Sequence, residues 1–184
     1  MDIRTNEMKA NLVPVIATVF KDELFESLFS GESKFKPGHS YLIKGRKMDK
    51  AFQHFADLVN RSFEGLLITR QHPNHIKKER FKKSPKVIWL STTLGKDYVD
   101  PHNLGSLTSM IHEFVESSQK TVIFVDGLEY LMINNDFSRI IKFIEYVNET
   151  VMQNNSVFFL AIDERVFEER ELAILERNLK IVSS

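Results

Sequence analysis

The stretch Thr121-Val-Ile-Phe-Val-Asp-Gly-Leu-Glu-Tyr130 decides the fold. Its first five residues are apolar or β-branched, and such a short continuous run is typical of a strand that is buried on both faces of a parallel sheet. Asp126 ends the strand and Gly127 begins the loop. Because ligands of α/β proteins bind beyond the carboxyl ends of the strands, Asp126 is the first candidate for a functional side chain.

A strand that ends in an acidic residue also occurs in P-loop ATPases, where the carboxylate helps to hold magnesium. Those enzymes need a second element, a glycine-rich loop of the pattern G-x-x-x-x-G-K-[ST], whose backbone N–H groups cradle the phosphates. The chain contains 7 Gly, and none of them builds such a loop. We therefore expect an ATPase-like sheet without the chemistry, and the sequence alone does not name the function.

Strand and helix patterns alternate on both sides of this stretch. Strands are predicted at 39–45, 65–69, 86–91, 121–125 and 156–162. Helices are predicted at 49–61, after an Asn103 N-cap, after an Asp136 N-cap and at 164–177. Apolar strands separated by helices indicate a parallel sheet that is covered on both faces. We predict an α/β fold, a three-layer sandwich with a mainly parallel sheet of about five strands.

The composition is that of an ordinary globular protein, and it narrows the choice of partners. Lys plus Arg and Asp plus Glu both total 25, so no net positive charge attracts nucleic acid or an anionic membrane. Cysteine is absent, which excludes disulfides and thiolate metal sites. The first residues do not resemble a signal peptide, and the longest apolar run, 12–20, is too short for a membrane span of roughly 20 residues. We expect a cytoplasmic protein with no membrane segment.

The first part of the chain carries a separate pattern. We divide the chain into an N-terminal helix with its linker, 1–36, and an α/β domain, 37–184. Residues 12–29 predict an amphipathic helix with a wide apolar face that includes Phe20, Leu24 and Leu28. Two alternatives stay open: the face covers its own domain, or it packs against the same helix of a second copy and forms a homodimer.

A set of short motifs stands in order between about residue 37 and residue 177. They are Gly38-His-Ser-Tyr-Leu-Ile43, Gly65-Leu-Leu-Ile-Thr-Arg70 with Pro73, Trp89-Leu-Ser91, Asn103-Leu104 with Leu107, Val125-Asp-Gly-Leu-Glu-Tyr-Leu131, Asn135 with Phe137, and Arg170-Glu-Leu-Ala-Ile-Leu-Glu176. With this set the chain resembles the archaeal family called domain of unknown function 835. The family brings no established activity. Its occurrence alone or beside signalling modules implies a regulatory role.

The layout also looks like a degenerate relative of the RecA and KaiC ATPases. In that comparison 41–45 is the strand before the P-loop, and 46–50 replaces the loop. A residual nucleotide would lie at an edge formed by Arg46, Lys47, Arg70, Asp126 and Glu129. The alternative is structural: Asp126 and Gly127 shape a turn, and the carboxylate accepts backbone hydrogen bonds.

The segment 70–86 concentrates positive charge, with seven Lys or Arg and one acidic residue. Lys77, Lys78 and Arg80 are its candidate contact residues. Three interpretations stay open: a solvated connection between strands, a contact with a protein or nucleotide, and a salt-sensitive contact with nucleic acid. Nucleic acid is the least favoured, because no aromatic residues interleave with the charges to stack bases.

Other chemistry has little support in the sequence. His72 and His75 are three residues apart, but no third metal ligand is evident beside them. The chain lacks the G-x-S-x-G motif of acyl transfer, and no pair of carboxylates suggests acid–base catalysis. We predict a non-catalytic interaction or regulatory module with no metal or cofactor and with a protein partner. The alternatives are a nucleotide sensor that does not hydrolyse its ligand, and nucleic-acid binding through 70–86.

Overall fold

The computed structural model describes residues 34–46 and 48–182. The chain divides into two compact units, Met1–Lys36 and Pro37–Ser184, and the second unit holds the α/β fold. The helix expected at 12–29, with Phe20, Leu24 and Leu28, lies outside the described residues, and so does Lys47.

A parallel sheet of seven strands forms the centre of this unit, in the order β4-β3-β2-β5-β6-β1-β7. The strands are β1 His39–Lys44, β2 Glu64–Thr69, β3 Lys86–Leu90, β4 Tyr98–Val99, β5 Thr121–Asp126, β6 Val157–Ile162 and β7 Lys180–Val182. The central strands β5 and β6 pair from Val122 with Val157 to Asp126 with Ala161. All six residues of β6 are buried, which explains why the central strands read as continuous apolar runs.

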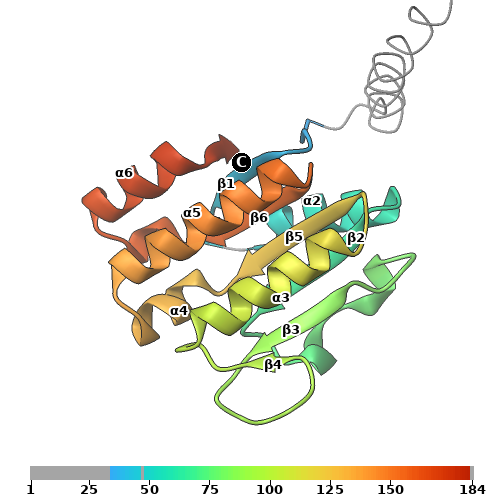
Figure 1. Ribbon diagram of the computed structural model, residues 1–184, viewed down its shortest axis with the longest axis horizontal. Helices are drawn as coiled ribbons and strands as arrows, with labels where there is room; N and C mark the ends of the chain where they lie inside the picture. Colours follow the sequence, from blue (N-terminus) through green and yellow to red (C-terminus); the bar gives the residue numbers. More distant parts are fainter. Residues whose placement is uncertain (1–33, 47, 183–184) are drawn as a thin grey trace, which may run out of the picture. The chain divides into compact units, whose positions relative to one another are not determined.

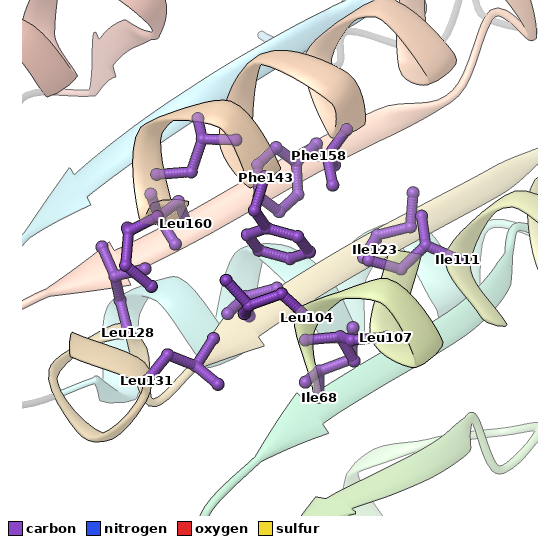
Figure 2. Close-up of a cluster of buried hydrophobic side chains, with 14 of the residues drawn as sticks. Ile68, Leu104, Leu107, Ile111, Ile123, Leu128, Leu131, Phe143, Phe158 and Leu160 are labelled. Atoms are coloured by element: carbon purple, nitrogen blue, oxygen red, sulfur yellow. The ribbon is translucent and has the colours of Figure 1, made fainter. Parts of the chain in front are cut away.

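Helices cover both faces of the sheet (Figure 1). They are α2 Asp49–Asn60, α3 Leu104–Glu116, α4 Leu128–Asn134, α5 Phe137–Gln153 and α6 Glu169–Asn178, with 3₁₀ turns η1 Pro73–His75, η2 Lys78–Arg80 and η3 Glu164–Val166. The larger core lies between the sheet and α3 to α6. Figure 2 shows Phe143 of α5 and Leu107 of α3 in this core, together with Ile123 and Phe158 of the sheet.

Helix α2 covers the opposite face through aromatic packing. Phe55 is fully buried, and its ring centroid lies 5.5 Å from that of Phe124 in β5. Because side chains alternate along a strand, Phe124 and Asp126 point towards the α2 face, whereas Ile123 and Val125 belong to the larger core. Asp126 therefore lies on the face of the sheet that α2 covers.

The α/β prediction is confirmed, with seven strands in place of five. The strands that the sequence did not predict, β4 and β7, are two and three residues long, too short for a periodicity to show. The Asn103 and Asp136 caps are confirmed, because their side chains accept hydrogen bonds from the N–H groups of Ser106 and Arg139, at 2.9 Å each. The last helix was predicted too early, since the chain first makes the turn η3.

Within the part of the chain that the structure describes, no helix combines the length and apolar character needed to cross a membrane.

Candidate functional site

The strand order creates a crevice between the carboxyl ends of β2 and β5. The connection after β2 runs along the α2 face, where Gln71 and His75 share a pocket with Phe52 of α2. The connection after β5 enters α4, which packs in the core on the other face. Neighbouring strands whose connections leave to opposite faces form the switch point at which ligands of α/β sheets bind.

A pocket of about 350 Å³ lies at this switch point. Its lining residues are Met48, Asp49 and Phe52 around the start of α2, Gln71, His75, Lys77 and Arg80 from the segment after β2, and Asp126 at the end of β5. The volume is near the lower end of the range of roughly 300–1,000 Å³ that small-molecule sites occupy.

Asp126 is the most deeply placed acid of the pocket. It pairs with Thr69 in the register of β2 and β5, and the Thr69 hydroxyl donates a hydrogen bond of 3.3 Å to its Oδ2 atom. Burial raises the pKa of the Asp126 carboxyl, the hydrogen bond from Thr69 opposes this rise, and the nearby charge of Glu129 adds to it. The site therefore favours a carboxyl group that takes up a proton more readily than an exposed aspartate.

The cationic residues of the pocket sit on a backbone that is fixed to α2. The Asn60 side chain donates to the Arg80 carbonyl over 3.0 Å and accepts from the Lys82 N–H over 2.7 Å. Phe81 is buried between them, with its ring centroid 5.4 Å from that of Phe52. These contacts hold the backbone, while the Lys77 and Arg80 side chains line the pocket.

The start of α2 does not resemble a phosphate cradle. Only residues 45–48 connect β1 to α2, and Asp49 places a carboxylate in the first turn of the helix. That carboxylate already complements the positive end of the helix dipole and repels an anion placed there. Gly127 has a φ of 138°, a backbone conformation that favours glycine. It caps the start of α4, however, and is not part of the connection between β1 and α2.

The structure brings together only part of the edge that the sequence suggested. Asp126 lines the same pocket as Lys77 and Arg80, which the sequence assigned to a separate basic surface. Arg70 instead stacks its guanidinium on the Tyr130 ring, 4.5 Å from the centroid, and does not line the pocket. Lys78 is exposed and does not line it either.

Glu129 of α4 and Arg46, which follows β1, both interact with Asp163 in the loop after β6. Glu129 accepts a hydrogen bond of 2.8 Å from the N–H of Asp163, so its carboxylate is already engaged by the backbone. Arg46 acts on the same residue, since its charge helps to lower the pKa of Asp163, which the hydrogen bond from Arg165 lowers most. The sequence also suggested a structural role for Asp126, in which its carboxylate accepts hydrogen bonds from the backbone. In the structure the carboxylate accepts a hydrogen bond from the Thr69 side chain.

The sequence did not single out Met48, Asp49, Phe52, Thr69 or Gln71. One signal was available for Thr69: it ends a strand beside Asp126 in a sheet of parallel strands. Asp49 and Phe52 lie on α2, the helix that follows the first strand. They line the pocket because the segment after β2 folds back against α2, and a local sequence pattern does not predict such a contact between distant segments.

This arrangement is suited to binding a small polar molecule. Lysine and arginine side chains are donors for an anionic group, and Phe52 and Met48 offer an apolar surface. Among residues 34–46 and 48–182, no group of three or more His, Asp or Glu side chains is placed to hold a metal ion.

Three comparisons with known proteins were made. The family model described as "Protein of unknown function (DUF835)" matches residues 45–179. A solved structure of a protein from Pyrococcus horikoshii OT3 is similar, with a TM-score of 0.54 and 16% sequence identity, over 86% of this chain and 85% of that one. At this identity the likeness shows the fold alone. No curated protein matches the chain.

Proposed function

The chain belongs to the DUF835 family of proteins of unknown function, so we propose its role from the geometry of the site: it is a non-catalytic regulatory module that binds a nucleotide or a similar phosphorylated small molecule. The observation that carries this proposal is the pocket at the β2–β5 switch point, which Asp126 lines together with the cations Lys77 and Arg80. Binding at such an edge is the common property of open parallel sheets.

The proposal excludes hydrolysis of the nucleotide. The sequence lacks the glycine-rich loop, and the helix that follows β1 begins with the carboxylate of Asp49. Glu129, the residue that would orient an attacking water in an ATPase, is occupied by the N–H of Asp163. We also propose, on the parallel sheet and the position of Asp126, that the domain is a degenerate relative of the RecA and KaiC ATPases.

The regulatory part of the proposal needs a protein partner. Its support is the sequence pattern of residues 12–29, whose wide apolar face, including Phe20, is typical of an interaction surface or a dimer seam. If the seam exists, Phe20→Asp should convert a dimer into monomers in light scattering of the full chain. We propose a cytoplasmic location, since the sequence carries no cysteine.

Nucleic-acid binding through 70–86 has less support. Ile76 and Phe81 of this segment are buried, and Lys77 and Arg80 line the pocket. Lys83 makes an ion pair with Glu64. The cations therefore do not form one continuous stripe for a phosphate backbone.

Thermal unfolding of the full chain tests the proposal. ATP, ADP and AMP are each added at millimolar concentration, with and without Mg²⁺. A ligand that binds only the folded state stabilises it by about 2.7 kcal/mol at 100 times its Kd, so we expect a rise in Tm with at least one nucleotide. Asp126→Ala should abolish the rise. Release of phosphate from ATP should not exceed the rate without protein.

The proposal is wrong if no nucleotide raises Tm at these concentrations. It is also wrong in its non-catalytic part if the chain releases phosphate from ATP and Asp126→Ala stops the release.

A further inference from the structure

The charged and the apolar residues of the pocket come from different segments of the chain, and this division indicates which class of ligand the pocket binds. Lys77 and Arg80 come from the segment after β2, whereas the apolar side chains Met48 and Phe52 come from the start of α2. A ligand with a charged end and an apolar or aromatic body matches this division. The following inference rests on the proposed function and concerns the same pocket.

Arg80 is held loosely at the pocket. Its Nη2 atom lies 4.0 Å from Oδ1 of Asp49, and its guanidinium carbon lies 5.3 Å from the centroid of the Phe52 ring. The Asp49 side chain is 76% exposed, so this ion pair is of the weak surface type. A phosphate oxygen that forms a charge-assisted hydrogen bond with the guanidinium is a stronger partner than Asp49.

Lys77 is an available cation beside it. Lys77 lines the pocket, and it makes no ion pair with any residue in 34–46 or 48–182. The next residue begins η2, and the contacts of Asn60 and Phe81 fix the backbone just beyond that turn. A fixed backbone lowers the entropy lost when the two side chains close on an anion.

The size of the pocket limits the ligand to a small one. A volume of about 350 Å³ suits one phosphate group with one ring system better than a triphosphate chain. The first turn of α2 bears Asp49, so the phosphate belongs on the segment after β2 and not on the helix terminus that P-loop enzymes use.

We propose that the pocket binds a singly phosphorylated small molecule of mononucleotide size, with its phosphate on Lys77 and Arg80 and its apolar body against Phe52. This orientation is the reverse of that in a P-loop ATPase, where the loop after the first strand holds the phosphates. Because lysine and arginine contact the phosphate directly, binding needs no Mg²⁺.

Calorimetric titration of the full chain with AMP, in buffer that contains EDTA, tests this orientation. Three variants are compared with the unchanged protein. The double variant Lys77→Gln with Arg80→Gln removes both cations, and we expect its Kd to rise at least about tenfold, since the charge-assisted hydrogen bonds to the phosphate are lost. The matched control, Lys78→Gln with Lys82→Gln, removes the same charge from exposed positions of the same segment and should change Kd less than about threefold.

For the third variant, Asp49→Asn, we expect the Kd for AMP to change in the opposite direction. Without its carboxylate, Arg80 loses its competing partner and the phosphate loses a repulsive neighbour, so Kd for AMP should fall severalfold. Adenosine should bind at least about tenfold more weakly than AMP, and inorganic phosphate should compete with AMP. Circular dichroism of each variant verifies that the fold is retained.

The outcomes separate this inference from the proposed function. If no nucleotide binds the unchanged protein at all, both fail. If a nucleotide binds but requires Mg²⁺, and its binding is unaffected by loss of Lys77 and Arg80, the proposed orientation is overturned while the proposed function stands. Equal binding of adenosine and AMP, or equal loss in the Lys78 and Lys82 control, also overturns it.

Discussion

Thr69 and Asp126 end neighbouring strands in register, and the Thr69 hydroxyl donates a hydrogen bond of 3.3 Å to Oδ2 of Asp126. The same hydroxyl oxygen accepts a hydrogen bond of 2.9 Å from the N–H of Gln71, where the chain leaves the sheet and enters the pocket wall. One hydroxyl group thus holds both the buried carboxyl and the first turn of the segment that carries Lys77 and Arg80.

We expect Thr69→Val to destabilise the protein. Valine has nearly the same shape, but it leaves the N–H of Gln71 and the carboxyl of Asp126 without their partner, and an unsatisfied buried polar group costs about 1–3 kcal/mol. Urea unfolding should therefore show a free energy of unfolding lower by that amount. The loss of the donor should also raise the pKa of Asp126 further.

Thr108→Val is the matched control for this substitution. The Thr108 hydroxyl donates only to the carbonyl of Leu104 in its own helix, so removing it should cost less than about 0.5 kcal/mol. Equal losses in the two variants would contradict the special role of Thr69.

Asp126→Asn should make the protein more stable at neutral pH. Burial raises the pKa of this carboxyl, so the folded state binds its proton more tightly than the unfolded state does. Its contribution to stability therefore grows as the pH falls through the folded pKa and declines as the pH rises. Asparagine carries no charge to desolvate, so the difference in Tm between variant and unchanged protein should be largest at neutral pH and shrink as the pH falls through the raised pKa of Asp126 towards its ordinary value of 3.8.

The comparison over this pH range reports on Asp126, because Asp163, the neighbouring acid whose pKa is also shifted, titrates at lower pH. Arg165 lowers the pKa of Asp163 to about 2, well below this range. A variant that is less stable than the unchanged protein by the same amount at every pH would show that the charged form of Asp126 is not disfavoured by burial.

The central part of the fold was predictable because its signals are local. The run 121–125 and the fully buried β6 are continuous apolar stretches, and the caps Asn103 and Asp136 stand directly before their helices. The edge strand β4 escaped prediction because two residues, Tyr98 and Val99, have no period and are recruited by pairing with β3.

The candidate site was only half predictable, because its second half depends on how distant segments meet. The sequence identified Asp126 from its place at a strand end, and it identified Lys77 and Arg80 from the charge run. It did not place them together, since that follows from Phe81 packing on Phe52 and from Asn60 holding the backbone at Arg80. It placed Arg70 at the ligand-binding edge because this residue follows a strand, whereas the guanidinium lies over the Tyr130 ring.

The role of Glu129 can be tested apart from any chemistry. Its carboxylate accepts the N–H of Asp163 and so joins α4 to the loop after β6. Glu129→Gln keeps an acceptor and should change the free energy of unfolding by less than about 0.5 kcal/mol, whereas Glu129→Ala should lower it by about 1 kcal/mol or more. Neither should weaken binding of AMP more than about twofold; a tenfold loss in Glu129→Gln would place this residue in the binding site.

The packing of α2 on the sheet, which positions Phe52 and Asp49, depends on the absence of a side chain at Gly65. A Cβ atom there would lie 2.6 Å from Cγ2 of Val59 and 3.0 Å from Cζ of Phe55. Gly65→Ala should therefore push α2 away from β2 and cost about 1–3 kcal/mol of unfolding free energy. Gly105→Ala is the matched control in the first turn of α3, where a Cβ atom meets only Oδ1 of Asn103 at 3.6 Å.

This control should change stability in the opposite direction, because alanine in a helix is favoured over glycine by roughly 0.5–1 kcal/mol where no clash occurs. Urea unfolding of both variants measures the two signs together. If α2 positions the pocket, Gly65→Ala should also weaken binding of AMP, while Gly105→Ala should leave it unchanged. A Gly65→Ala protein that is as stable as the unchanged chain would mean that α2 does not pack on β2 at the distance described.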